Sequence, residues 1–552
     1  MAFKKQPWKI HNLSTFRLGM NTQQTPDEIQ DEELADCENF SVEEDSLSTS
    51  PGYSSWDDDL ASHPGPYWGG FFFKRSDGNN IDIRQRQGKL EYIDPNSDKT
   101  WLPCVLPTTG SPAAEITLTE KPCTFAALND ICIWTNGYDT VMSSTDGITW
   151  TLQPSIPISR VVFNNGKNRV LYLAQKDSPY RFDWSNINAP LTIDASSYQL
   201  VDPNSNGMVL GAGKTPEGTT LIFKESALYS VSDFVDDGVI DINYIGHTLL
   251  TSHRTICTTN NSVIWCSWAG VEEYIGGTIR NIFGRIAIST SKGEVGSRNA
   301  GLTGELYCAA YYNNKYHLSM PDHNISDDYN GQEYIIYKNL VRNDPIQPYV
   351  ISRNKRFFGC YWIEDAEFEY GRDITLYVGD SRPESELAIT GSPAVQESPI
   401  FAWVNDFREV SAVGFPIEQG LMGEAQPAYF VTKYFTQKVP FFVKKFKKLF
   451  LNCKFTDSAD IQIGYRSDPF SVFTMVTIPV ETTDIDWEYD DGTTGGFTEG
   501  FGFSQESIAN LFQDIENTEK PRGIQFKVEV NEIYDVTNFG LAYKYQVKEK
   551  FL

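Results

Sequence analysis

The chain has 552 residues, a length that predicts two to four domains at about 150 residues per domain. Aromatic residues make up 13% of it, which excludes a disordered protein because such chains lack the apolar side chains that build a core. The 46 Lys and Arg against 73 Asp and Glu give a formal net charge of −27, which argues against a protein that grips nucleic acid or anionic lipid over a wide surface.

Targeting and metal signals are missing from the sequence. Residues 1–10 contain two lysines but no apolar region typical of a secretory signal, and no stretch approaches the roughly 18 apolar residues of a membrane span. The nine cysteines are scattered, which predicts reduced core residues in a protein made in a cytoplasm. The six histidines are equally dispersed, so we expect neither a metal nor a cofactor.

Short runs that alternate apolar and polar residues dominate the chain. Most are rich in β-branched and aromatic residues, and turn residues such as Gln87-Gly88, Asn136-Gly137 and Asn165-Gly166 separate them. Almost no helical pattern lies between these runs, so the sequence predicts an all-β fold, either a sandwich, a barrel or a propeller. The predicted strands include residues 80–86, 89–93, 131–134, 170–174, 220–223, 227–231, 263–268, 315–320, 333–337, 357–362 and 374–378.

Two segments carry helix signals. Thr25-Pro26-Asp27-Glu28 is a capping box, which predicts an acidic turn or short helix through Cys37. Near the other end, Ser504 precedes apolar residues at i, i+3, i+4 and i+7 spacing, which predicts a helix over residues 504–515.

A phosphate-binding loop can be set aside. Gly213-Lys214-Thr215 ends like such a loop, but Met208 stands where the motif requires Gly. The residues that follow indicate a turn and a strand, whereas a phosphate loop requires a helix there.

The segment from Ser144 to Trp150 resembles a shortened Asp-box, the hairpin that marks blades of sialidase-type propellers. In this pattern Asp146 accepts hydrogen bonds from turn amides, Gly147 takes a positive φ, and Trp150 anchors the hairpin. The motif is structural and occurs once, so we expect no enzyme and propose no catalytic residues. A glycosidase would need paired carboxylates at the propeller mouth.

A basic strip runs through residues 443–454, where four lysines stand on an aromatic background. Three interpretations remain open: a nucleic-acid contact, lysines that protect a strand edge, or a strip that meets an acidic neighbouring subunit. The lysines are Lys444, Lys445, Lys447 and Lys448.

Three segments together resemble the tail nozzle family of short-tailed bacteriophages, also called packaged-DNA stabilisation or tail tube proteins. The first is the N-terminal pattern from Leu18 to Gly52, in which Ser50 stands where the family has Arg. The second lies between Gly246 and Ile288 and contains the blade-like run from Ser262 to Val271. The third is the C-terminal region, with Lys433, Pro440, Lys444, Lys447, Ile461–Tyr465 and Pro521–Lys527.

The resemblance implies an N-terminal arm at residues 1–52, a β-propeller with inserted loops at 53–425, and a β-sandwich-like platform domain at 426–552. A shift in charge accompanies the second boundary, because residues 426–552 have a net charge of −4 and the preceding residues −23. The implied function is structural: a virion protein that forms a six-membered ring, closes and extends the DNA exit channel, retains packaged DNA and conducts it during ejection.

The implied partners are other copies of the chain, the adaptor or portal, tail fibre proteins, and double-stranded DNA that passes without sequence-specific binding. Six chains of −27 each carry −162, and a wall of that sign repels the duplex and lets it slide. We expect Arg17, Asn39, Pro51 and Gly52 of the arm and the four lysines to serve assembly. The polar loops at 379–399 and 321–332 are candidates for a gate.

Two alternatives remain. One is a glycan-binding or sialidase-like propeller, such as a receptor-binding protein. The other is a baseplate or stopper protein of a long-tailed phage.

Overall fold

The computed structural model of the chain describes residues 9–13, 16–42, 47–50, 53–55, 66–93, 101–110, 114–205, 207–231, 240–286, 303–322, 328–368, 371–382, 400–403, 428–436, 443–455, 459–480, 507–514, 523–530 and 536–548. Within these residues nearly all regular structure is β-strand, with a single α-helical turn α1 (Thr303–Leu306) and a 3-10 turn η1 (His253–Thr255). The predicted all-β class is confirmed.

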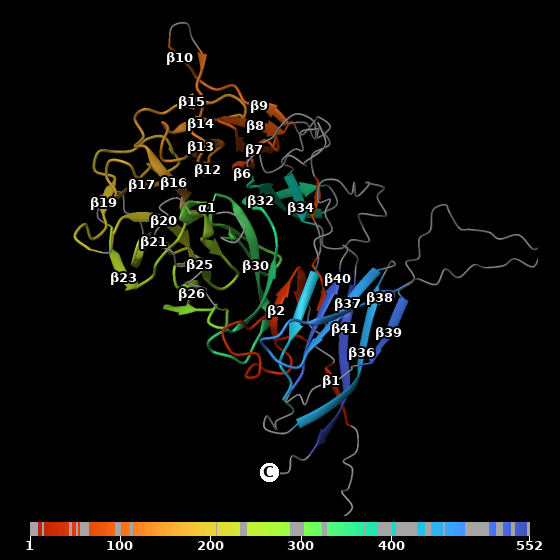
Figure 1. Ribbon diagram of the computed structural model, residues 1–552. Helices are drawn as coiled ribbons and strands as arrows, with labels where there is room; N and C mark the ends of the chain where they lie inside the picture. The colour runs from red at the N-terminus through yellow and green to blue at the C-terminus, as the bar shows by residue number, and fades with distance from the viewer. Residues whose placement is uncertain are drawn as a thin grey trace, which may run out of the picture.

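The central body is a β-propeller (Figure 1). The described residues include seven four-stranded antiparallel sheets that form its blades. In six of them the strands follow one another in chain order as a meander, and in the seventh the fourth strand comes from before the first blade. The first strands of neighbouring blades lie in contact around a ring. Blades 1 to 3 are β6 (Tyr67–Phe73), β7 (Ile81–Arg86), β8 (Lys89–Ile93), β9 (Trp101–Pro103); β12 (Thr124–Leu128), β13 (Ile131–Thr135), β14 (Met142–Ser144), β15 (Thr151–Leu152); and β16 (Ser159–Asn164), β17 (Val170–Gln175), β18 (Arg181–Trp184), β19 (Tyr198–Leu200). Blades 4 and 5 are β20 (Val209–Lys214), β21 (Thr220–Lys224), β22 (Leu228–Val231), β23 (Ile242–Gly246); and β24 (Cys257–Thr258), β25 (Val263–Ser267), β26 (Gly270–Ile275), β27 (Thr278–Asn281). Blades 6 and 7 are β28 (Cys308–Tyr312), β29 (Lys315–Pro321), β30 (Asn330–Val341), β31 (Tyr349–Asn354); and β32 (Phe358–Phe368), β33 (Gly371–Asp380), β34 (Ile400–Trp403), β5 (Tyr53–Ser55).

Tight turns set the register of the blades. Asn129-Asp130, Asn313-Asn314 and Gln87-Gly88 take positive φ at both positions, between 43° and 70°, as type I′ hairpins require. Asn, Asp and Gly enter this region at low cost, which is why the sequence places them between apolar runs. The predicted turn at Gln87-Gly88 is confirmed.

The ring closes between blade 7 and blade 1. The outermost strand of blade 7 is β5, which comes from the N-terminal side of the propeller and pairs with β34. On the inner side, the Trp362 indole of β32 lies against Gly70 of β6 so closely that a Cβ at Gly70 would stand 2.3 Å from the ring. The Trp362 indole also donates a hydrogen bond to the Asp82 carboxylate, at 3.1 Å.

Two further sheets lie beside the propeller (Figure 1). One contains β2 (Leu34–Glu38), β35 (Ala428–Thr432), β40 (Gln525–Val530), β37 (Ala459–Arg466) and β38 (Thr474–Val480), and the other β1 (Lys9–Leu13), β41 (Val536–Lys548), β36 (Val443–Phe455) and β39 (Ser507–Asp514). The two sheets meet where the rings of His11 and Phe435 pack 5.5 Å apart, which fits the expected sandwich-like arrangement. Each sheet takes one strand from the first 52 residues. The boundaries at 52 and 425 stay predictions.

Two short strand pairs complete the described elements: the first is buried against β31 and β41, and the second is exposed. The pairs are β3 (Phe40–Val42) with β4 (Leu47–Thr49), and β10 (Thr108–Thr109) with β11 (Ala114–Glu115).

Both helix predictions need correction. Residues 507–514 form the strand β39, which pairs with β36 from Ser507↔Phe455 to Asp514↔Lys448. Pairing with a long strand overrides the apolar spacing of this segment, since periodicity is a weak signal in a short segment. The capping box at Thr25 closes a single turn, in which Glu28 N–H donates to the Thr25 carbonyl, and β2 begins at Leu34.

The N-terminal arm is locked onto blade 6 by a buried ion pair. The Arg342 guanidinium, 2% exposed, pairs with the Glu33 carboxylate, 1% exposed, and also donates to the Leu18 carbonyl at 2.7 Å. The other oxygen of Glu33 accepts from the Asn21 amide at 3.0 Å and from the Gln30 N–H at 2.7 Å. One carboxylate therefore organises the loop of the arm and attaches it to the propeller.

Replacing Glu33 tests this lock. We expect Glu33→Ala to lower the free energy of unfolding by about 3 kcal/mol, because it leaves the buried Arg342 guanidinium with Asp344, 3.9 Å away, as its remaining ion-pair partner among the described residues. Glu32→Ala is the control, since Glu32 pairs with Arg17 at the surface and should cost less than about 1 kcal/mol. Urea unfolding of the full chain, followed by tryptophan fluorescence, compares the two. Equal losses would contradict the assignment.

Candidate functional site

The innermost strands of the seven blades enclose a channel along the propeller axis. Its wall is mainly apolar and includes Phe71, Phe125, Phe163, Ile256 and Tyr361, one from each of five blades. The empty space within it is about 840 Å³, including solvent at its open part.

Three cysteines face this channel from blades 2, 6 and 7. Burial raises the pKa of Cys123, Cys308 and Cys360 to about 12, so these thiols stay protonated and unreactive near neutral pH. The eight cysteines whose side chains the structure describes are all free thiols, as expected. Among the described residues no group of three His, Cys, Asp or Glu side chains could hold a metal ion.

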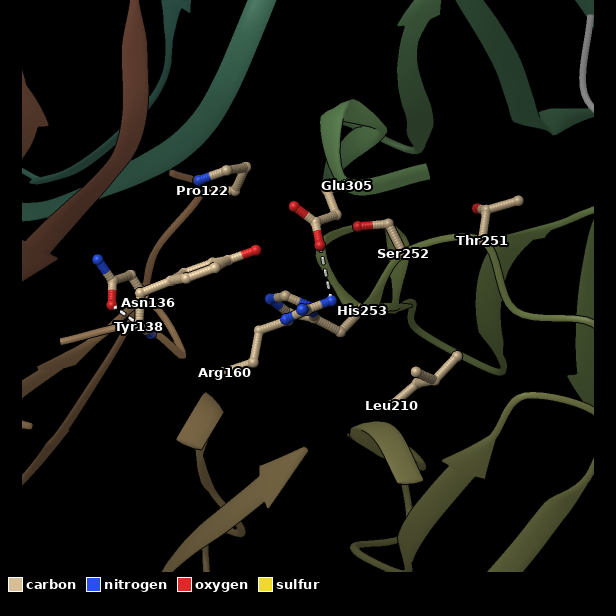
Figure 2. Close-up of a pocket in the computed structure, with 9 residues that line it drawn as sticks. All are labelled: Pro122, Asn136, Tyr138, Arg160, Leu210, Thr251, Ser252, His253 and Glu305. Carbon is tan, nitrogen blue, oxygen red and sulfur yellow. Dashed lines mark hydrogen bonds and ion pairs between the residues drawn. The ribbon is translucent and has the colours of Figure 1, made fainter. Parts of the chain in front are cut away.

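At one end the channel meets a smaller pocket, which we call the mouth (Figure 2). Its residues come from segments that lead into the innermost strands of blades 2 to 6 and from the hairpin after β13. They are Pro122, Asn136, Tyr138, Arg160, Leu210, Thr251, Ser252, His253 and Glu305.

Two arginines cross the channel at the mouth. Arg160 of blade 3 pairs with the Glu305 carboxylate of α1, which precedes blade 6, at 2.9 Å. Arg254 of η1 donates to the backbone carbonyls of Glu305, at 3.4 Å, and of Gly359 in blade 7. The Arg160 side chain of blade 3, the Arg254 side chain before blade 5, the Glu305 side chain before blade 6 and a backbone carbonyl of blade 7 are therefore linked at this end of the channel.

Local sequence explains how η1 presents His253 and Arg254. The Ser252 hydroxyl accepts from the Arg254 N–H at 3.3 Å, and the Thr255 hydroxyl donates back to the Ser252 carbonyl at 2.7 Å. This Ser-x-x-Thr turn fixes the two side chains between them at the start of blade 5.

His253 is electrically neutral at physiological pH. Burial, together with the positive charges of Arg254 and Arg160, lowers the pKa of the imidazole to about 3. Its Nε2 is buried and has no hydrogen-bond partner among the described residues. The mouth thus contains the Arg160 guanidinium, the Glu305 carboxylate and the uncharged His253 imidazole with an unused polar atom, and the Arg254 guanidinium lies beside it in the channel wall.

The predicted assembly residues lie in different environments. The Arg17 side chain is exposed and pairs with Glu32 at 2.8 Å. Asn39 is buried with a φ of 60°, and its side-chain oxygen accepts from the Lys355 N–H at 2.9 Å, so its described contacts hold the arm against the end of blade 6. Pro51 and Gly52 lie outside the described residues, so their role in assembly stays a prediction.

The predicted lysine strip lies on β36. The backbone of β36 pairs with β41 from Val443, whereas its pairing with β39 begins only at Lys448. The register of the pairing with β41 shifts between Phe446 and Lys448. The structure does not bring the strip together with Arg17 or Asn39 in any described contact, and the role of Lys444, Lys445, Lys447 and Lys448 stays a prediction.

Both local motifs have the structure expected of them. In the hairpin between β14 and β15, Asp146 accepts from the N–H groups of Ile148 and Thr149 at 2.9 and 2.7 Å, while Gly147 has a φ of 78°. The Trp150 indole donates to the Gly147 carbonyl at 3.2 Å. Gly213-Lys214-Thr215 ends β20 and enters the turn before β21, as expected.

The mouth could not be predicted from the sequence. Arg160, His253 and Glu305 come from three different blades, and no motif or spacing connects them. Of the two loops expected to act as a gate, residues 383–399 of the first and 323–327 of the second lie outside the described residues, and the gating role stays a prediction. Among the described helices none is long and apolar enough to cross a membrane.

No protein-family model and no curated protein matches the sequence. Similar solved structures include BBS1N in complex with ARL6DN (TM-score 0.37, 10% identity), virginiamycin B lyase from Staphylococcus aureus (0.36, 9%) and YCF48 from Cyanidioschyzon merolae (0.34, 11%). Each match covers 64% of this chain and 98% of the other. The likeness is too distant to inform function, and the propeller assignment rests on the sheet order of this chain.

The neutral state of His253 makes stability depend on pH. The unfolded chain takes up a proton near pH 6.5 and the folded chain only near pH 3, so folding loses stability as the pH falls below about 6.5. Between pH 7 and pH 5 the free energy of unfolding should fall by about 2 kcal/mol. His253→Asn should remove this loss, and His247→Asn, at an exposed histidine, should retain it. Urea unfolding of the three proteins at both pH values measures it, and identical pH dependence in all three would contradict the buried neutral state.

Proposed function

We propose that this chain is a structural subunit of a bacteriophage tail that assembles into a ring at the end of the DNA exit channel. The ring retains the packaged genome and conducts it during ejection. The proposal starts from the sequence resemblance and the acidic composition, and three features of the fold support it.

The propeller axis bears most directly on the proposal. Arg160 pairs with Glu305 at the mouth, and beside it Arg254 contacts the backbone carbonyls of Glu305 and Gly359, so these side chains occupy part of one end of the axis. We therefore place the proposed conduit between copies of the chain rather than along the axis of one propeller. A glycosidase is less compatible with this mouth, because among the described residues lining it and the channel Glu305 is the single carboxylate, and it is paired with Arg160.

The C-terminal sheets offer surfaces suited to contact between subunits. The turn between β37 and β38 exposes Phe470 and Val472, at 94% and 91% of their full accessible area. The turn is held in shape by the Asp468 carboxylate, which accepts from the Phe470 N–H at 3.0 Å, and by Arg466, which donates to the Ser471 carbonyl at 2.9 Å. Ordered apolar side chains that face water favour a protein contact there.

The charge of the chain fits passage of a like-charged polymer. A duplex carries about one negative charge per 1.7 Å, and basic side chains along a bore would retain it through many phosphate contacts. A surplus of carboxylates instead repels the duplex from the wall and leaves it free to slide.

Imaging of purified tails tests the proposal directly. We expect electron microscopy to show the chain as a distal six-membered ring whose bore is lined mainly by Asp and Glu. A basic bore, or a chain that stays monomeric and binds or cleaves glycans, would overturn it.

The lysine strip provides a second test. We expect Lys444, Lys445, Lys447 and Lys448 changed to Glu to abolish ring or tail assembly, measured by sedimentation and microscopy, while circular dichroism shows a folded monomer. A matched control changes four exposed lysines of the propeller to Glu, which alters the net charge equally and should leave assembly intact. These are Lys74, Lys89, Lys167 and Lys176. Normal assembly of the strip variant would refute its role.

A further inference from the structure

The mouth and the channel together carry more guanidinium groups than carboxylates, in a chain that is acidic as a whole. Of the described residues that line the mouth and the channel, the charged ones are Arg160, Arg254 and Glu305, a net charge of +1 in a chain of −27. Guanidinium groups bind carboxylates and phosphates through parallel N–H donors, and they gain strength where solvent is partly excluded.

The Arg160 guanidinium already has an anionic partner within the chain, the Glu305 carboxylate. Glu305 stands 2.9 Å from the Arg160 guanidinium, and the two side chains are 17% and 38% exposed. Figure 2 shows the Tyr138 hydroxyl directed toward this pair, and the His253 ring drawn beside the Arg160 guanidinium. No described residue is a partner for the buried His253 Nε2. More hydrogen-bond donors therefore surround Glu305 than its carboxylate engages.

We propose that the mouth is a binding site for a small oxyanion, such as phosphate or a dicarboxylate, and that Glu305 occupies the anion position in the free protein. A ligand would displace the Glu305 carboxylate from Arg160 and take hydrogen bonds from the Arg160 guanidinium, the Tyr138 hydroxyl and the neutral His253 ring.

The backbone can remain in place while the carboxylate leaves. Arg254 holds α1 through the Glu305 carbonyl and blade 7 through the Gly359 carbonyl, and neither contact involves the Glu305 side chain. Rotation of one partly exposed side chain is then sufficient to open the site. This inference is independent of the proposed tail function, because the site lies within one chain.

Titration calorimetry of the full chain at constant ionic strength tests the site, with inorganic phosphate and succinate as separate probes. Glu305→Gln removes the internal competitor and should bind at least one probe about tenfold more tightly than the unchanged protein, which corresponds to about 1.4 kcal/mol. Adding Arg160→Gln to that variant should abolish the gain. Glu32→Gln is the matched control, because it also frees an arginine, Arg17, but at the surface.

Each result of the titrations either supports or contradicts the proposed site. Preference for phosphate or for succinate identifies the class of ligand, and tighter binding restricted to E305Q supports the site. Equal gains in E305Q and E32Q, binding that survives loss of Arg160, or no binding by folded E305Q would overturn the proposal. Should E305Q not fold, the unchanged protein and R160Q are titrated at millimolar concentrations, where binding that requires Arg160 supports the site and its absence overturns it.

Discussion

Pairing between distant parts of the chain is the constraint on which the architecture depends. The last blade is incomplete without β5, and the two C-terminal sheets include β2 and β1 from the arm. Blade 7 combines strands from both ends of the propeller sequence. Opening the ring at this blade would therefore break the pairing between β34 and β5. The arm is therefore an integral part of both bodies, and the buried Glu33–Arg342 pair holds it against the blade it crosses.

Ionic contacts between buried groups reinforce this arrangement at other joints. Between blades 5 and 6, the Glu273 carboxylate receives hydrogen bonds from Lys338 and from Arg280, at 2.7 Å to the latter. Burial alone would raise the pKa of Glu273, but these donors lower it, so the group remains charged. Neighbouring blades are thus joined by directional contacts as well as by apolar packing, which limits how far they can slide against each other.

Local structure could be predicted from the sequence, whereas structure that depends on contacts between residues distant in the chain could not. The hairpin at Gln87-Gly88 and the turn around Asp146 follow from residue types that favour particular backbone conformations, and the structure has both. The helix expected over 504–515 failed because its partner strand, β36, lies some 60 residues earlier, beyond the reach of a periodicity argument. The number of blades could not be counted from the sequence, because the sequences of the blades have diverged. The mouth could not be predicted either, because Arg160, His253 and Glu305 become neighbours only when the ring closes.

The chain ends impose an order on biosynthesis. Lys9 pairs with Tyr545, so β1 leaves the ribosome hundreds of residues before its partner exists. At about 5–20 residues per second, the arm waits roughly half a minute or longer with its strands unpaired. A nascent polypeptide consequently lacks both finished C-terminal sheets until residues near 545 have been synthesised, whereas blade 7 needs residues only up to Trp403. The propeller can therefore close well before the two sheets beside it.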